Sequence, residues 1–227
     1  MIDKKSAHEA VYQTLVEKQY EGWGGSKYKD RMAGWDDNID KILRESHLVE
    51  GKILELGCGA GDVSIKLAQR GFDVVGIDFS ITAIKWANEK AAAIFSKTAA
   101  NFDFEKIRFF EADVTDDNLL TDEQFDLIID GNCLHCLFDE ARASFYNNVK
   151  RLIKHSGYFF VASAIMAPNT HEKPKISEID RCLLSKEALE QELADNGFIV
   201  LNTWVIEHET HHHYRGLLKV RPDDKTL

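Results

Sequence analysis

The stretch KILELGCGAGD, residues 52–62, decides the fold class of this chain. Its apolar beginning is followed by glycines at alternate positions, Gly57, Gly59 and Gly61, and a helix-like pattern starts at Asp62. A buried strand, a glycine turn and a helix in this order are typical of the nucleotide site of a doubly wound α/β domain. Glycine suits such a turn because its backbone adopts dihedral angles that other residues avoid and lets a ligand approach closely.

The spacing of these glycines differs from that of the dinucleotide fingerprint. In that fingerprint the third glycine lies three positions after the second, a position that Asp62 occupies here. A pyrophosphate binds bare backbone N–H groups at a helix N-terminus, and a carboxylate there would repel it. A cofactor with a cationic sulfonium and an ammonium group would instead tolerate carboxylates such as Glu55 and Asp62. The stretch resembles the first motif of the class I S-adenosylmethionine-dependent methyltransferases.

Alternating strand and helix patterns continue after the glycine motif. The patterns predict strands at 52–56, 72–78, 106–111, 125–130 and 158–165, and helices at about 62–70, from Ser80, at about 139–154 and from Ser185 to Asn196. Such alternation implies a mainly parallel sheet. A last pair of strands, 198–206 and 214–220, has no helix between its members and is expected to be antiparallel. The predicted fold class is α/β: a Rossmann-like, seven-stranded, mostly parallel sheet with one antiparallel strand and helices on both faces, as the resemblance also implies.

The segment before the glycine motif is predicted to form a helical cap. Residues 5–20 have the pattern of a helix. Its apolar side is expected to carry Ala7, Val11, Leu15 and Val16. Residues 21–35 read as irregular, and Asp36 or Asp37 is expected to cap a second helix. The predicted domains are an N-terminal helical cap and flap at 1–48 and a methyltransferase catalytic domain at 49–227.

The resemblance implies a cofactor site at the carboxyl ends of the strands, where open α/β sheets bind ligands. Asp78 would accept hydrogen bonds from the ribose hydroxyls, and Phe79 would pack on the adenine. Asp113 would bind the adenine amino group, while Glu55 would either contact the cofactor amine or hold the glycine turn. An N-terminal flap would hold the cofactor carboxylate, or its aromatic residues would only pack against the core. The predicted cofactor residues are Trp23, Tyr28, Arg31, Glu55, Gly57, Cys58, Gly59, Asp78, Phe79, Ser80, Asp113, Val114, Asp130, Gly131 and Asn132.

The chain of 227 residues fits one α/β domain with a few additions, or at most two small domains. The net charge of −10 disfavours binding to nucleic acid through phosphate contacts. The N-terminus shows no secretory signal, and no apolar stretch is long enough to cross a membrane. The four cysteines do not predict a disulfide framework. We expect a cytoplasmic protein that acts on a small-molecule acceptor, with neither nucleic acid nor a membrane as a partner; the oligomeric state is left open.

Histidines gather near the end of the chain, in the segment HETHHHYR at 208–215. If strand 198–206 runs parallel to the main sheet, the turn that follows lies on the ligand side, so these histidines are predicted near the methyl acceptor. His135, which follows the fourth strand, would lie on the same rim. Histidine can act as a base near neutral pH or bind a metal, and a solvated hairpin without a chemical role is the third possibility. The predicted catalytic residues are His135, His211 and His213, and no metal is predicted.

The predicted function is direct in-line methyl transfer from S-adenosylmethionine to oxygen, nitrogen or sulfur of a small molecule. The methyl group of a sulfonium is already activated, so the protein must align the acceptor and, where the acceptor is protonated, help to remove a proton. Two alternatives remain open. One is a catalytically silent cofactor-binding regulatory module, and the other is a nicotinamide-dependent oxidoreductase, which Asp62 disfavours. The loop at 165–180 is a candidate lid.

Overall fold

Two compact units make up the chain, Met1–Val114 and Thr115–Leu227. The computed structural model describes residues 4–98, 106–168 and 180–222. Its seven strands have the order β3-β2-β1-β4-β5-β7-β6, and each unit has helices of its own. This is the predicted Rossmann-like α/β class, with a mostly parallel sheet. Among the described residues, no helix combines the length and apolar character that crossing a membrane requires.

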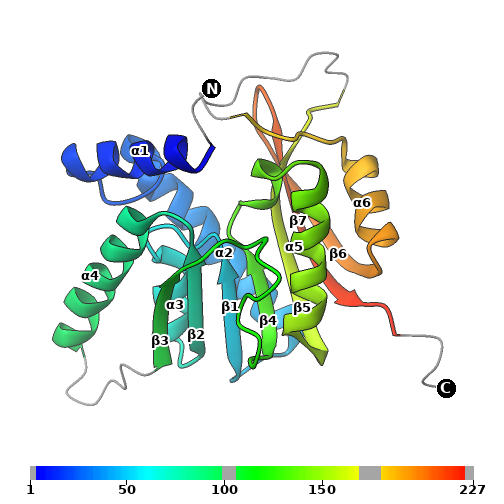
Figure 1. Cartoon of the computed structure of the whole chain (residues 1–227), viewed down its shortest axis with the longest axis horizontal. Helices are drawn as coiled ribbons and strands as arrows, with labels where there is room; N and C mark the ends of the chain where they lie inside the picture. The colour runs from blue at the N-terminus through cyan, green and yellow to red at the C-terminus, as the bar shows by residue number, and fades with distance from the viewer. Residues whose placement is uncertain (1–3, 99–105, 169–179, 223–227) are drawn as a thin grey trace. The chain divides into compact units, whose positions relative to one another are not determined.

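Three parallel strands form the centre of the first unit. They are β1 (Lys52–Leu56), β2 (Asp73–Asp78) and β3 (Ile107–Glu111), as labelled in Figure 1. β2 lies between the other two, with Leu56 opposite Ile77 and Asp78 opposite Glu111. The three strands therefore end at one edge, which brings the turns that follow them together. Apolar side chains such as Leu54 make these strands the buried core of the unit.

The helices of the first unit differ from prediction before the glycine motif. They are α1 (Lys4–Glu17), the short 3-10 helix η1 (Gly25–Lys27), α2 (Tyr28–Ser46), α3 (Asp62–Gln69) and α4 (Ile81–Thr98). The prediction that residues 21–35 are irregular and that a helix starts at Asp36 or Asp37 is wrong from Tyr28 onward. Met32 and Trp35 are buried together with Ile39. Their spacing of three and four residues is that of one helical face, so the apolar face of α2 begins before Asp36. The glycines in the stretch obscured that pattern.

The second unit contains the strands that close the sheet. They are β4 (Phe125–Asp130), β5 (Ile153–Ile165), β6 (Phe198–Glu207) and β7 (His212–Val220). β4 and β5 are parallel, whereas β7 is antiparallel to both β5 and β6. β6 therefore runs parallel to β5, as predicted, and β7 is the inserted antiparallel strand. Its helices are η3 (Leu134–Cys136), α5 (Asp139–Leu152) and α6 (Lys186–Asp195), and the predicted cap of α6 is confirmed because Ser185 Oγ accepts a hydrogen bond from Ala188 N at 3.1 Å.

Candidate functional site

The glycine turn after β1 has the unusual backbone that its sequence predicts. Gly57, Gly59 and Gly61 have φ angles of 74°, 55° and 75°, in the left-handed region that favours glycine. The N–H groups of Gly57 and Cys58 both donate to the carbonyl oxygen of Ile77, at 2.9 and 2.8 Å. A Cβ on Gly61 would lie 2.7 Å from Phe109 Cζ. The turn is thus tied to β2 and leaves no room for a side chain at its end.

Asp78 joins the end of β2 to this turn. Its Oδ2 accepts a hydrogen bond from Gly59 N and its Oδ1 accepts one from Ser80 N, both at 2.9 Å. Burial raises the pKa of Asp78 to about 6, against the opposing effect of these two hydrogen bonds. Because each carboxylate oxygen can accept two hydrogen bonds, the side chain keeps capacity for the hydroxyls of a ribose. The hydrogen bonds that Asp78 accepts from Gly59 N and Ser80 N therefore fit the predicted nucleotide site.

The two other acidic residues of the motif have partners within the unit. Glu55 is buried and accepts hydrogen bonds from Ser64 N at 2.9 Å and Ser64 Oγ at 2.5 Å. Burial raises the pKa of Glu55 to about 8. Asp62 Oδ1 lies 2.6 Å from Lys90 Nζ and accepts a bond from Tyr28 Oη at 2.8 Å. Glu55 thus holds the first turn of α3, and the charge of Asp62 is paired with a lysine of α4, contacts that spacing alone did not predict.

Helix α1 contacts several of the predicted cofactor residues. Lys5 Nζ lies 2.6 Å from Asp113 Oδ2, and the His8 ring meets the Phe79 ring edge-on with centroids 5.4 Å apart. The sequence did not predict these contacts because it assigned the packing of this helix to another side, formed by its apolar residues. Val16 of that side is 43% exposed.

Two further residues of α1 extend this contact to the glycine turn. Glu9 accepts hydrogen bonds from Ser80 Oγ at 2.6 Å and from Thr82 Oγ1. Tyr12 is buried, and its hydroxyl occupies the space that a Cβ on Gly59 would need. Together with Lys5 and His8, these positions repeat every three or four residues and form one helical face, which is the signal that the sequence did contain.

The predicted flap residues lie beside α1. The Trp23 ring is stacked 6.2 Å from that of His8 and lies 5.1 Å from that of Tyr12, which is the packing role considered as the alternative. Burial raises the pKa of Tyr12 and Tyr28, and the positive charge of Arg31 opposes that rise in both. Arg31 is therefore a partly buried cation in the region where the resemblance expects one.

In the second unit, Asp130 organises the turn after β4. It is fully buried, and its Oδ1 accepts hydrogen bonds from Cys133 N at 2.8 Å and Leu134 N at 3.1 Å. Burial raises the pKa of Asp130 to about 6. Asn132 has a left-handed φ of 69°. Asp130 therefore holds the turn that leads into η3 and presents Gly131 and Asn132 on a fixed backbone.

An arginine that sequence reasoning missed clamps the same turn. Arg142 of α5 donates to the carbonyl oxygen of Leu134 at 2.8 Å, and its Nε and Nη2 lie 2.9 and 2.8 Å from Glu192 Oε1 on α6. Tyr146 Oη donates to the same Glu192 oxygen at 2.6 Å. The clamp joins α5, α6 and the short helix that carries His135. Glu192 is 50 residues from Arg142, so no local pattern indicates the pair.

The structure places His135 near the histidines of β7. His135 is 6% exposed, and its ring accepts a hydrogen bond from Ala164 N, a residue of β5 that pairs with His213. His208 is on the exposed turn between β6 and β7. His211 Nε2 and His213 Nε2 are 3.1 Å apart, so these two rings lie together. The described part of the chain contains no group of three histidine, cysteine or acidic side chains that could hold a metal ion. All four cysteines lie in the described part of the chain, and none forms a disulfide. Most of the candidate lid at 165–180 lies outside the described residues.

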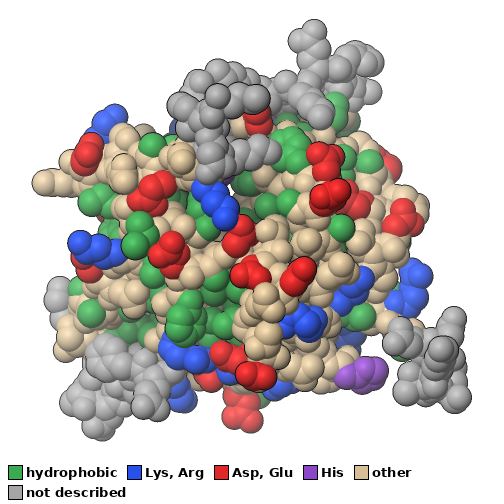
Figure 2. Space-filling view, in the orientation of Figure 1, with side chains coloured by type: hydrophobic (Ala, Val, Ile, Leu, Met, Phe, Trp, Pro, Cys, Tyr) green, Lys and Arg blue, Asp and Glu red, His purple; other side chains and the backbone are tan. Residues whose placement is uncertain are grey.

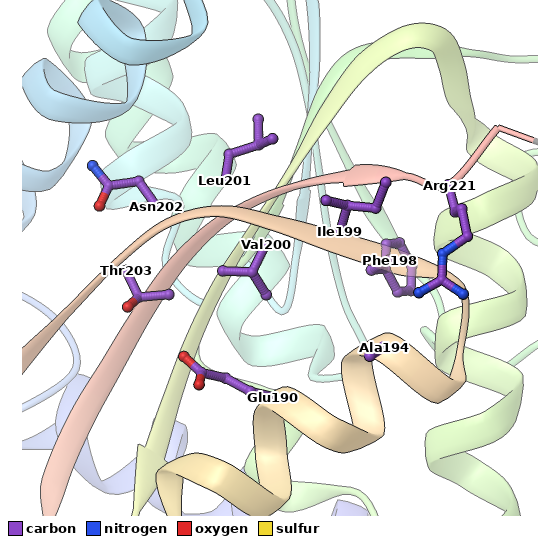
Figure 3. A pocket seen from close by; sticks show the side chains of 9 residues that line it. All are labelled: Glu190, Ala194, Phe198, Ile199, Val200, Leu201, Asn202, Thr203 and Arg221. Atoms are coloured by element: carbon purple, nitrogen blue, oxygen red, sulfur yellow. The ribbon is translucent and has the colours of Figure 1, made fainter.

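A groove of about 520 Å³ lies between α6 and β6. Figure 3 shows Glu190 and Ala194 of α6 facing Val200 of β6, with Arg221 further along. None of the residues predicted for the cofactor or for catalysis lines this groove. The groove is thus a separate feature from the predicted site.

The α/β fold, with its glycine turn after β1 and a buried aspartate at the end of β2, is that of a doubly wound nucleotide-binding domain. The chain belongs to the methyltransferase domain family, which it matches over residues 48–213. The chain thus contains a methyltransferase domain, which argues against the nicotinamide-dependent alternative.

Two curated relatives are similar over much of the chain. The 2-heptyl-1-hydroxyquinolin-4(1H)-one methyltransferase of Mycobacteroides abscessus is 29% identical over 145 residues, 60% of this chain and 60% of the relative. Thiocyanate methyltransferase 1 of Brassica oleracea is 30% identical over 156 residues, 66% of this chain and 64% of the relative. The chain thus spans less than two thirds of the length of these relatives.

A solved structure has the same fold over nearly the whole chain. The magnesium protoporphyrin IX methyltransferase of Synechocystis PCC 6803, crystallised with bound S-adenosylmethionine, has a TM-score of 0.70. It is 17% identical, and the match covers 98% of this chain and 99% of that one.

Proposed function

We propose that this methyltransferase transfers a methyl group from S-adenosylmethionine to oxygen, nitrogen or sulfur of a small-molecule acceptor. The observation that carries the cofactor is the bonding of Asp78 to Gly59 N and Ser80 N beside three left-handed glycines. The relatives named for hydroxyquinolone and thiocyanate methylation support a small acceptor. In this proposal Asp78 binds the ribose, Phe79 and Asp113 the adenine, and Arg31 the cofactor carboxylate.

The proposed partners follow from charge and size. On the face in Figure 2, acidic and basic side chains are interspersed. Together with the net charge of −10, this favours a small acceptor over nucleic acid.

We further propose a cytoplasmic location, and a division between a helical cap at 1–48 and a catalytic domain at 49–227. His135, His211 and His213 are proposed to act on the acceptor.

Calorimetric titration with S-adenosylmethionine and its demethylated product tests the cofactor assignment. We expect Asp78→Asn to weaken binding about tenfold, because the amide cannot accept on both sides as the carboxylate does. The matched control is Asp117→Asn, which changes an exposed aspartate and should leave affinity unchanged. A dissociation constant weaker than about 1 mM for the wild-type protein would contradict the proposal.

Product assays test the acceptor class. Formation of the demethylated cofactor with a free thiol, phenol or amine is expected. Methyl transfer that occurs only with RNA or protein acceptors would overturn the small-molecule assignment while leaving the cofactor assignment intact.

A further inference from the structure

His135 is held by main-chain contacts on two sides. Its Nδ1 accepts a hydrogen bond from Ala164 N of β5 at 3.1 Å. Its own carbonyl oxygen accepts one from Cys182 N at 2.7 Å. The last residue of β5 that pairs with β4 is Phe160. Ala164 lies beyond that pair, and its N–H group donates to the ring of His135. The ring has one fixed orientation as a result.

This contact fixes which nitrogen carries the proton. A backbone N–H can only donate, so His135 Nδ1 must present its lone pair to Ala164 N. A neutral imidazole then carries its hydrogen on Nε2, and an imidazolium would place a second hydrogen against the amide hydrogen. His135 therefore cannot take up a proton without breaking the bond to Ala164.

The surroundings of His135 are cationic. Burial lowers the pKa of His135 well below its usual range, and Arg181, His213, Arg215 and Arg142 lower it further. Among these, Arg142 has its charge matched by Glu192. On β7, His213 and Arg215 are opposite Ala164 and Ala162 of β5. A positive field that disfavours an imidazolium favours an anion at the same place.

We propose that His135 donates a hydrogen bond from Nε2 to the methyl acceptor instead of acting as a base, and that the acceptor is a small anion or a weakly acidic hydroxyl or thiol bound as its anion. This inference rests on the proposed methyl transfer. The acceptor loses its proton to solvent before the reaction. Its lone pair then forms the bond to the methyl carbon, and the electron pair of the broken carbon–sulfur bond stays on the sulfur of the donor, so no proton moves in the step.

Methyl transfer to 4-methoxythiophenol and 4-nitrothiophenol tests this proposal, because the two thiols differ in acidity. The pH at half-maximal kcat/KM is expected to be lower for the nitro compound in the wild-type protein. The amide of His135→Gln can accept from Ala164 N and still donate, so kcat/KM of this variant should stay within about tenfold of the wild type. His135→Phe should lose about 100-fold in kcat/KM. The control is His155→Gln at an exposed position of β5. A half-maximal pH that is equal for both thiols and disappears in His135→Gln would show a base and overturn the proposal, as would equal rates with neutral aniline.

A measurement on the protein alone separates this inference from the proposed function. Nitrogen-15 spectra of labelled histidine, assigned by the signal lost in His135→Gln, should show Nδ1 unprotonated and Nε2 protonated from about pH 5.5 to 8. Titration with 4-nitrothiophenolate should then shift the Nε2 resonance. A ring protonated on Nδ1, or no shift on addition of the thiolate, contradicts the proposal. Failure to bind S-adenosylmethionine would overturn the proposed function, whereas these spectra would still decide the state of His135.

Discussion

The turns after β1 and after β4 both follow a buried parallel strand, but they are built differently. In the first, the left-handed backbone is made by Gly57, Gly59 and Gly61. In the second, the path is held by side chains: Asp130 accepts from two backbone N–H groups, and Arg142 binds a carbonyl oxygen of the turn. The first turn therefore depends on residues that can adopt a left-handed backbone, whereas the second depends on the side chains of Asp130 and Arg142.

Removing the clamp should have the largest effect. Arg142→Met leaves Glu192 and the Leu134 carbonyl without this partner, and we expect the free energy of unfolding to fall by about 3–4 kcal/mol, because a buried arginine that binds a carbonyl oxygen and a partly exposed carboxylate is removed. Urea denaturation measures the loss. The control is Lys154→Met, which breaks a pair with Asp126 whose lysine is 41% exposed and should cost less than about 1 kcal/mol. Equal losses would show that the second turn does not depend on its clamp.

Adding a single methyl group tests the glycine-built turn. Gly61→Ala should lower the free energy of unfolding by about 2–4 kcal/mol, since it combines left-handed strain with a clash against Phe109. Gly71→Ala has a φ of 96° but nothing within 4 Å of the new methyl group, so it should cost only the strain, about 1–2 kcal/mol. If denaturation gives the two variants the same stability, packing at Gly61 is not a constraint.

The pH dependence of stability tests the burial of Glu55. The raised pKa, about 8 against 4.5 in the unfolded chain, means that the folded state holds a proton that the unfolded state releases. This contribution is complete below about pH 4.5 and is lost as the pH rises to about 8. The pKa values of Asp78 and Asp130 are raised to about 6, so most of their effect on stability is lost below pH 8, before that of Glu55 is lost.

As the pH rises from 6 to 8, the wild type should lose stability that Glu55→Gln keeps. The difference in free energy of unfolding between variant and wild type should therefore move in favour of the variant by on the order of 1–2 kcal/mol. Urea denaturation at the two pH values measures the difference, and Glu111→Gln, at an exposed position, is the control. A difference that does not change with pH would mean that Glu55 is ionised in the folded state.

The smallest effect is expected at Asn132, the left-handed residue of the second turn. Asn132→Ala should cost about 1 kcal/mol and Asn132→Gly less than about 0.5 kcal/mol, because glycine adopts a φ of 69° without strain. Thermal denaturation distinguishes the two variants. An equal loss of more than about 1 kcal/mol in both variants would show that side-chain contacts of Asn132 outweigh its backbone conformation, and the contrast between the turns would sharpen.

Sequence patterns predicted most of the fold because its elements have local causes. The glycine turn, the Ser185 cap and the order of strands around β7 were all confirmed. The start of α2 was predicted wrongly because glycines interrupt a helical pattern that burial of Trp35 supports. The contacts of α1 were missed because polar and aromatic residues, including Tyr12, make them.

The candidate site divides along the same line. By itself, the sequence determined the glycine turn and the acidic residue at the end of β2, because a left-handed backbone and a strand end are properties of a few neighbouring residues. Only the tertiary structure decided that Glu55 holds α3, that Arg142 meets Glu192, and that His135 presents a lone pair to Ala164. Those states depend on burial, on charges and on hydrogen bonds between residues far apart in the chain, and such contacts leave no periodic signal in the sequence.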